Sequence, residues 1–127
     1  MRDLHNDKSV GRIAVIARFP GPGRPRSRVV IHDGLVYAVA TAPVKSASLY
    51  DQTKQALAFL DESLALAGTN KSRVLQATVY ITDMSAKPEM NRAWEEWVDF
   101  AQPPQRACLG VALEGSDLVE IVIIAAT

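Results

Sequence analysis

Two apolar runs near the C-terminus decide the fold: residues 103–113 read PPQRACLGVAL, and residues 118–124 read LVEIVII. The polar segment EGSD (residues 114–117) separates them, a pattern typical of two strands joined by a turn. We therefore predict a buried β-hairpin. Each run carries one charge, Arg106 or Glu120, which is costly in an apolar strand unless it is paired, hydrogen-bonded or facing a wet cavity.

These two charges predict a small concave site. The planar guanidinium of Arg106 suits bidentate binding of a carboxylate, so the site would bind a small anion with Glu120 nearby. A structural ion pair between Arg106 and Glu120 or Asp117 is the alternative.

The geometry of the predicted hairpin limits a direct pair between the two charges. A three-residue turn would place Glu120 opposite Gly110, about 13 Å from Arg106 at about 3.3 Å per residue. A turn of two or four residues would place them on opposite faces of the hairpin. A bulge or a neighbouring subunit would then have to bring Glu120 into the same cleft.

The composition indicates a cytoplasmic protein with one domain spanning residues 1–127. The 14 basic and 14 acidic residues give no net charge that would attract nucleic acid or a membrane. The single cysteine excludes an internal disulfide and fits a reducing compartment. Residues 1–9 lack the apolar region of a signal peptide, and we expect them to be disordered. The longest apolar run is interrupted by Glu120 and is too short to span a bilayer.

The N-terminal half begins with short β-structure. Residues 13–17 predict a short strand, and the prolines and glycines of residues 20–25 predict an irregular loop. Two apolar runs, residues 28–32 and 35–40, flank Asp33-Gly34, which predicts a hairpin with a type I′ turn.

Two helices and one further strand follow. Ser48 is the expected N-cap of a helix over residues 49–67, and Gly68 is its expected C-terminal cap. The strand over residues 73–82 alternates, with Leu75, Ala77, Val79 and Ile81 predicted to face the core and Gln76, Thr78 and Tyr80 to face away. Pro88 and Glu89 suit the first turn of a second helix. Its predicted apolar stripe is Met90, Ala93, Trp94, Trp97 and Ala101, and it is expected to end at Pro103-Pro104.

This order of elements predicts an α+β fold, a mixed sheet with both helices packed on one face. The uncovered face is predicted to carry Gln76, Thr78, Tyr80, Arg106, Cys108 and Glu120. Leu118, Val122 and Ile124 are also predicted to lie on it, which favours contact with another subunit.

The remaining candidate residues have simpler interpretations. A nucleophilic Cys108 would need a base partner, and the two histidines, His5 and His32, lie in the N-terminal segment and beside a turn. Cys108 is therefore interpreted as a small wall residue. The two histidines have no metal-ligand spacing, so no metal site is predicted. The amide of Asn91 could reach the sheet from the second helix or could be solvated.

Together these motifs resemble the RidA (YjgF) family of imine and enamine deaminases, over roughly residues 25–126. The resemblance rests on Arg106-x-Cys108, Glu120 in Val-Glu-Ile, Gln55-Ala56-Leu57, residues 68–72 (GTNKS), residues 80–83 (YITD) and Met90-Asn91-x-x-Trp94.

The resemblance implies a chorismate-mutase-like fold and a homotrimer with three clefts between subunits. It also implies hydrolysis of reactive 2-imino or 2-enamino acids to 2-keto acids and ammonia, without metal or organic cofactor. Arg106 would hold the substrate carboxylate and Glu120 would position the attacking water. The backbone at Cys108 would line the pocket, and Asn91 would support it.

The chain departs from the family pattern in two places. Family members commonly carry Ser-Gly-Gln where this chain has Val39-Ala40-Thr41, so Ala40 and Thr41 would line the substrate site in place of Gly and Gln. The early tyrosine of the deaminases is replaced by the Arg26-Ser27 region.

Two alternative functions remain at this point. The first is a non-catalytic trimer that binds a small carboxylate such as a 2-keto acid, suggested by the changes at Val39-Ala40-Thr41. The second is an endoribonuclease, an activity attached to some family members. Arg18, Arg24, Arg26 and Arg28 could contact phosphates, but the neutral net charge weighs against a nucleic-acid surface.

Overall fold

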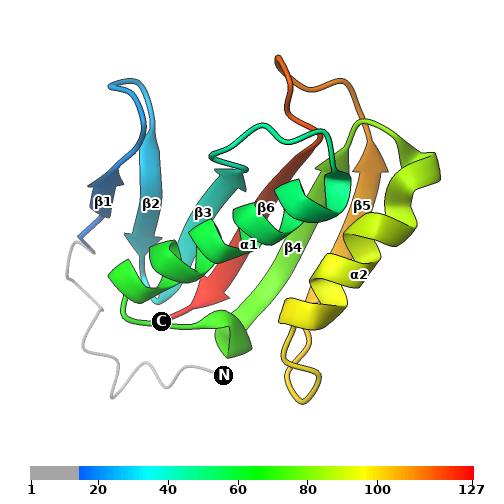
Figure 1. The fold of residues 1–127 in the computed structure, drawn as a ribbon. Helices are drawn as coiled ribbons and strands as arrows, with labels where there is room; N and C mark the ends of the chain where they lie inside the picture. The colour runs from blue at the N-terminus through cyan, green and yellow to red at the C-terminus, as the bar shows by residue number, and fades with distance from the viewer. Residues whose placement is uncertain (1–14) are drawn as a thin grey trace.

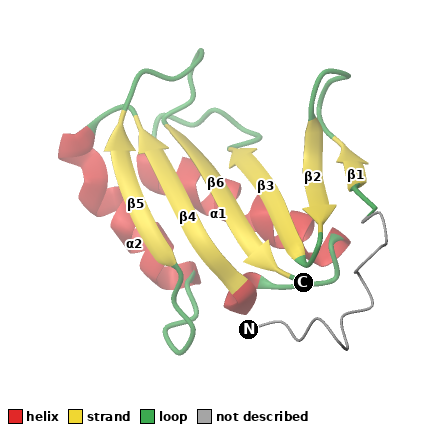
Figure 2. Ribbon diagram, turned by 180° about the vertical axis from the view of Figure 1, so that it is seen from behind, coloured by secondary structure: helices red, strands yellow, loops and turns green. Residues whose placement is uncertain are grey.

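The computed structural model describes residues 15–127. Six strands form one sheet in the order β1-β2-β3-β6-β4-β5, and two helices cover one of its faces (Figures 1 and 2). Only the β4–β5 pair is parallel among the strand pairs of this range. The predicted α+β fold, with both helices on one face of a mixed sheet, is confirmed. The elements are β1 Ala17–Pro20, β2 Ser27–His32, β3 Leu35–Thr41, α1 Leu49–Leu66, the 3₁₀ turn Lys71–Arg73, β4 Val74–Ile81, the 3₁₀ turn Met84–Ala86, α2 Lys87–Trp97, β5 Gln105–Gly110 and β6 Val119–Ala126.

The predicted hairpin around Asp33-Gly34 is confirmed by β2 and β3. Both turn residues have positive φ, 50° at Asp33 and 81° at Gly34, as a type I′ turn requires. The ladder runs from the His32–Leu35 pair to the Val29–Ala38 pair and then stops, although both strands continue beyond it. The start of β2 and the end of β3 are therefore not paired with each other.

The first helix also forms as predicted. The side chain of Ser48 accepts a hydrogen bond from the Asp51 N–H at 3.1 Å, which caps the N-terminus. After the helix, Gly68 has φ +75°, a conformation that lets the chain reverse without a side-chain clash.

The C-terminal hairpin predicted from the sequence is wrong. Strand β5 pairs in parallel with β4, whereas β6 lies between β3 and β4 and is antiparallel to both. Helix α2 connects β4 to β5, and a helical crossover of this kind returns the chain parallel to the first strand. The loop after β5 then crosses the end of β4 to begin β6 (Figure 2).

Several further expectations about the strands and the second helix are corrected. The first described strand is Ala17–Pro20 rather than residues 13–17. Residues 13 and 14 of that predicted span lie outside the described residues, as do residues 1–9. Leu75 is half-exposed instead of facing the core, because the register of β4 against β6 shifts between Val74 and Gln76. Such a bulge inserts one residue that has no partner on the neighbouring strand, so the alternation of inward and outward side chains is interrupted there.

The second helix ends at Trp97, well before the two prolines. Val98 adopts an extended conformation, and the Asp99 carboxylate accepts a hydrogen bond from the Ala101 N–H at 2.9 Å, which stabilises a turn. Ala101 is therefore exposed and is not part of the apolar stripe. Leu118 precedes β6 and packs against the core instead of lying on the uncovered face.

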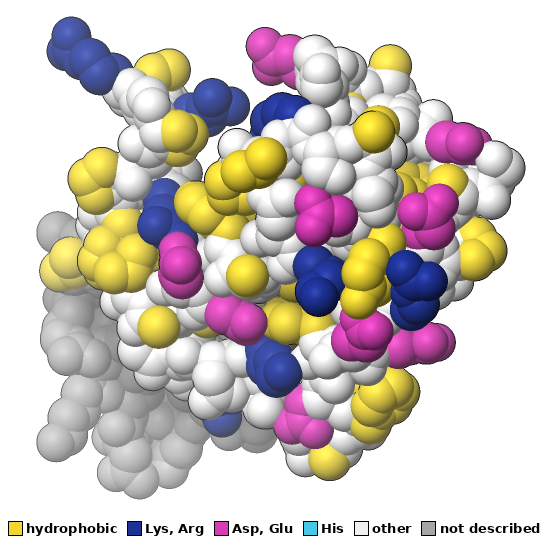
Figure 3. Space-filling model, viewed as in Figure 1, with side chains coloured by type: hydrophobic (Ala, Val, Ile, Leu, Met, Phe, Trp, Pro, Cys, Tyr) yellow, Lys and Arg dark blue, Asp and Glu magenta, His cyan; other side chains and the backbone are white. Residues whose placement is uncertain are grey.

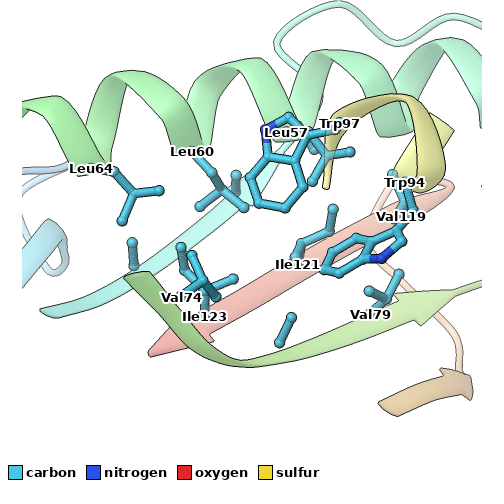
Figure 4. Close-up of a cluster of buried hydrophobic side chains, with 14 of the residues drawn as sticks. Leu57, Leu60, Leu64, Val74, Val79, Trp94, Trp97, Val119, Ile121 and Ile123 are labelled. Carbon is cyan, nitrogen blue, oxygen red and sulfur yellow. The ribbon is translucent and has the colours of Figure 1, made fainter. Parts of the chain in front are cut away.

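The core lies between the helices and the sheet. Leu57, Leu60 and Leu64 of α1 point toward the strands, and the two tryptophans of α2 enter the same layer (Figure 4). The tryptophan rings are 5.2 Å apart, within the range of a favourable aromatic pair. Alternate residues of β6 face this core, namely Val119, Ile121, Ile123 and Ala125.

We predict that Leu60→Ala lowers the free energy of unfolding by about 2–5 kcal/mol, because Leu60 is fully buried and its truncation leaves a cavity under α1. Urea denaturation followed by circular dichroism measures the change. Leu66→Ala is the control, because Leu66 belongs to the same helix but is half-exposed. Equal destabilisation by the two variants would contradict this account of the core.

Candidate functional site

Arg106 lies on the edge strand β5 and points toward the helices. Its register partner on β4 is Ala77, which is buried under the helices, and paired residues of adjacent strands share a face. The Arg106 Nη2 donates a hydrogen bond to the Asn91 Oδ1 at 3.0 Å, and its Cζ lies 5.3 Å from the centre of the Trp94 ring. Its Nη1 also lies 3.8 Å from the sulfur of Met90. The prediction that Arg106 lies on the uncovered face is therefore wrong.

The guanidinium of Arg106 has unused binding capacity. Among residues 15–127, no carboxylate lies within ion-pair distance of it, and its one close oxygen partner is the neutral amide of Asn91. Arginine has five N–H donors, so several stay available. Beside it lies a depression of about 280 Å³ between α2, the following loop and β5, lined in part by Asn91, Trp94 and Phe100. We call this the Arg106 depression.

Glu120 lies on β6 and faces the opposite side of the sheet. It is paired with Thr41 on β3 and with Tyr80 on β4, and all three are half-buried on the face without helices. This confirms the predicted facing of Glu120 and Tyr80.

Beside Glu120, a pocket of about 310 Å³ opens where β2 and β3 are no longer paired. Its lining includes the two residues expected there from the family pattern, Ala40 and Thr41, together with Glu120. The aromatic ring of Phe59 from α1 also lines it. We call this cavity the β2–β3 pocket.

Three cationic residues also line the β2–β3 pocket, namely Arg26, Arg28 and Lys45. Lys45 was not identified as a site residue from the sequence, because it is an isolated charge in a loop with no motif around it. Arg26 and Arg28 stood out only as members of an arginine-rich segment. Their place beside Glu120 depends on the register of β2, β3 and β6.

Cys108 lines neither cavity. It is paired with Val79, faces the helices and packs against the core, so its predicted place on the uncovered face is wrong. Cys108 is thus part of the packing against the core and not a wall of either cavity, and nothing in this packing suggests a nucleophile.

Arg106 and Glu120 do not share a site within one chain. They lie on opposite faces of the sheet, with β4 between their strands. The residue of β5 level with Glu120 is Leu109, and Arg106 lies three residues before it, about 10 Å along the strand at about 3.3 Å per residue. The parallel pairing of β5 causes the separation, because it aligns Arg106 with Ala77.

Two absences hold for residues 15–127. No helix there is long and apolar enough to cross a membrane. No three side chains of His, Cys, Asp or Glu gather there in a way that could hold a metal ion.

Comparison with known proteins identifies the family. The family model described as Endoribonuclease L-PSP matches residues 17–127, a range that includes all the strands and helices of the described residues. A RutC family protein of Haemophilus ducreyi is 42% identical over 119 residues, covering 92% of this chain and 96% of that protein. The chain belongs to the RidA (YjgF) family.

Two further similar proteins bear on the fold and on the chemistry. A crystal structure of a YjgF family member from Neisseria meningitidis is 32% identical, with a TM-score of 0.84, and covers 89% of this chain and 95% of that one. A goat (Capra hircus) protein named 2-iminobutanoate/2-iminopropanoate deaminase is 28% identical over 123 residues, covering 91% of this chain and 90% of its own.

Proposed function

We propose that this RidA family member hydrolyses reactive 2-imino and 2-enamino acids to 2-keto acids and ammonia. The observation that carries the proposal is the half-buried guanidinium of Arg106, which a neutral amide orients and which no carboxylate of residues 15–127 neutralises. A cation held in this way is suited to bind the carboxylate of a small substrate bidentately. The name of the goat relative supports the reaction class.

The chemistry requires little beyond orientation and charge. Glu120 accepts a proton from a water molecule. The oxygen of that water attacks the carbon of the C=N bond, which gives a carbinolamine. Protonation of the nitrogen then allows ammonia to leave, and the C=O bond of the 2-keto acid forms. Water and imine are consumed, and keto acid and ammonia are released, so no oxidant or reductant takes part. Holding the carboxylate at Arg106 orients the C=N carbon for attack.

The reaction needs two copies of the chain, because Arg106 and Glu120 lie on opposite faces of one sheet. In the proposed homotrimer, each cleft contains the Arg106 depression of one copy and the β2–β3 pocket of another. The uncovered face supports this assembly, because large apolar side chains are exposed on it. These are Tyr37, Val39, Leu109 and Val122. Burying such a patch against a second copy is favourable.

The other candidate residues take supporting roles in this proposal. Asn91 fixes the orientation of the Arg106 guanidinium through its 3.0 Å hydrogen bond. Ala40 and Thr41 form the wall next to Glu120. The Cys108 backbone would contact substrate only from the edge of the sheet, since its side chain packs inward.

A ribonuclease function is less well supported by the arrangement of the arginines. Arg28 donates to Ser63 and to the Phe59 carbonyl and is paired with Glu62, so it serves to hold β2 against α1. The chain also has no net positive charge that would attract a polyanion.

We predict that Arg106→Ala lowers kcat/KM for 2-iminobutanoate by about 100-fold, because the charge-assisted bonds to the substrate carboxylate are lost. An amino-acid oxidase generates the imine, and ammonia release is followed with and without the protein. The kcat/KM of Arg106→Lys should lie between those of wild type and Arg106→Ala. Lysine keeps the positive charge but lacks the planar guanidinium that binds a carboxylate through two N–H groups.

Arg92→Ala is the matched control for this prediction. Arg92 is an exposed arginine of the same helix as Asn91, and it lies over the ring of Tyr50. Its loss should leave the rate unchanged. Full activity in Arg106→Ala would refute the proposed role of Arg106. A folded wild-type trimer without any acceleration would favour the non-catalytic binder of small carboxylates.

A second prediction concerns Glu120. Glu120→Gln keeps the shape of the side chain but removes the base, so kcat should fall by about 100-fold or more while KM changes little. Steady-state kinetics with 2-iminobutanoate measures both constants. Glu114→Gln, an exposed carboxylate in the loop before β6, is the control and should behave as wild type. A raised KM with an unchanged kcat would show that Glu120 binds substrate instead of activating water.

A further inference from the structure

The three cations of the β2–β3 pocket differ in their partners. The Arg28 guanidinium lies 3.1 Å from the Glu62 carboxylate and stacks 3.8 Å above the Phe59 ring. The Lys45 Nζ lies 2.5 Å from the Asp117 Oδ1, and it also donates to the Ala42 carbonyl. Both charges are therefore already neutralised within the fold.

Arg26 is the cation without a partner. Within residues 15–127, its side chain makes no hydrogen bond and no ion pair, and it lines the pocket next to residues of β3. It is exposed at the end of the β1–β2 loop, where Figure 3 shows cationic side chains gathered over the tip of that loop. An arginine in this position is free to bind an anion in the pocket.

The loop that carries Arg26 has a defined shape. The Gly21 N–H donates to the Arg26 carbonyl at 3.2 Å, which closes the loop at its base. A Cβ at residue 21 would lie 2.5 Å from that carbonyl oxygen, so only glycine permits the approach. Pro22 and Pro25 further restrict the backbone between these two residues. The loop thus fixes the backbone of Arg26 at the rim of the pocket.

The pocket therefore presents two opposite charges without partners, Glu120 and Arg26. We infer that it selects 2-imino acids whose side chain carries a second carboxylate. The protonated imine lies toward Glu120, and the side-chain carboxylate binds Arg26. This inference rests on the proposed function, in which Arg106 of another copy holds the first carboxylate. A volume of about 310 Å³ suits a small metabolite, since ligand pockets begin at about 300 Å³.

The test compares two imines of similar length, 2-iminoglutarate and 2-iminopentanoate, each generated in place by an amino-acid oxidase. Wild type should show a kcat/KM about tenfold higher for 2-iminoglutarate. Arg26→Gln should lower that value about tenfold, because a charge-assisted bond becomes a neutral one, and should lower the value for 2-iminopentanoate less than threefold. Arg24→Gln, in the same loop but outside the β2–β3 pocket, should change neither.

A binding measurement separates this inference from the proposed reaction. Calorimetric titration with 2-oxoglutarate and 2-oxopentanoate requires no turnover, and 2-oxoglutarate should bind about tenfold more tightly, with the difference lost in Arg26→Gln. If neither imine is hydrolysed but this difference is observed, the deaminase proposal fails and the selectivity stands. Preference for the compound with a single carboxylate in either assay, or equal losses in Arg26→Gln and Arg24→Gln, would overturn the inference.

Discussion

Strand β6 forms hydrogen-bonded ladders with β3 on one side and β4 on the other, and the rest of the fold depends on this central position. Its alternate residues Val119, Ile121 and Ile123 are buried under the helices. Without β6, the β2–β3 hairpin and the β4–α2–β5 unit would be two separate pieces of sheet. The last strand in the sequence therefore joins the N-terminal and C-terminal halves of the molecule (Figure 1).

The same arrangement separates the two charged residues. Strand β4 lies between β6 and β5. Glu120 of β6 is therefore level with Tyr80 of β4 and Leu109 of β5, whereas Arg106 of β5 is level with Ala77 of β4. Each charge then lies beside its own cavity, and the two charges face opposite sides of the sheet. In the proposed function these two regions are the halves of one site, which a symmetric assembly would bring together.

Local features of the fold could be predicted from the sequence because they depend on neighbouring residues. The Asp33-Gly34 turn, the Ser48 cap and the alternation of β4 from Ala77 onward all follow from conformational preferences within a few residues. The partner of each C-terminal strand could not be predicted in this way, since the apolar runs of β5 and β6 suit a hairpin as well as a crossover. The bulge at Leu75 and the early end of α2 depend on contacts with β6 and on hydrogen bonds of Asp99.

The sequence pointed to Arg106 and Glu120 as candidate residues but did not predict their relative positions. Arg106 and Glu120 stood out as charges in apolar strands, and the hydrogen bond from Arg106 to Asn91 agrees with an amide reaching the sheet. The face of Glu120 was also predicted, but the face of Arg106 and the cations of the β2–β3 pocket depend on the strand order.

The central claim is that one site takes Arg106 from one copy and Glu120 from another. Subunit complementation tests it most directly, by mixing Arg106→Ala and Glu120→Gln chains in equal amounts after unfolding and reassembly. In random trimers, three quarters are mixed and each of these has one intact site out of three, so about a quarter of wild-type deaminase activity should return. A mixture as inactive as its two components would contradict the account.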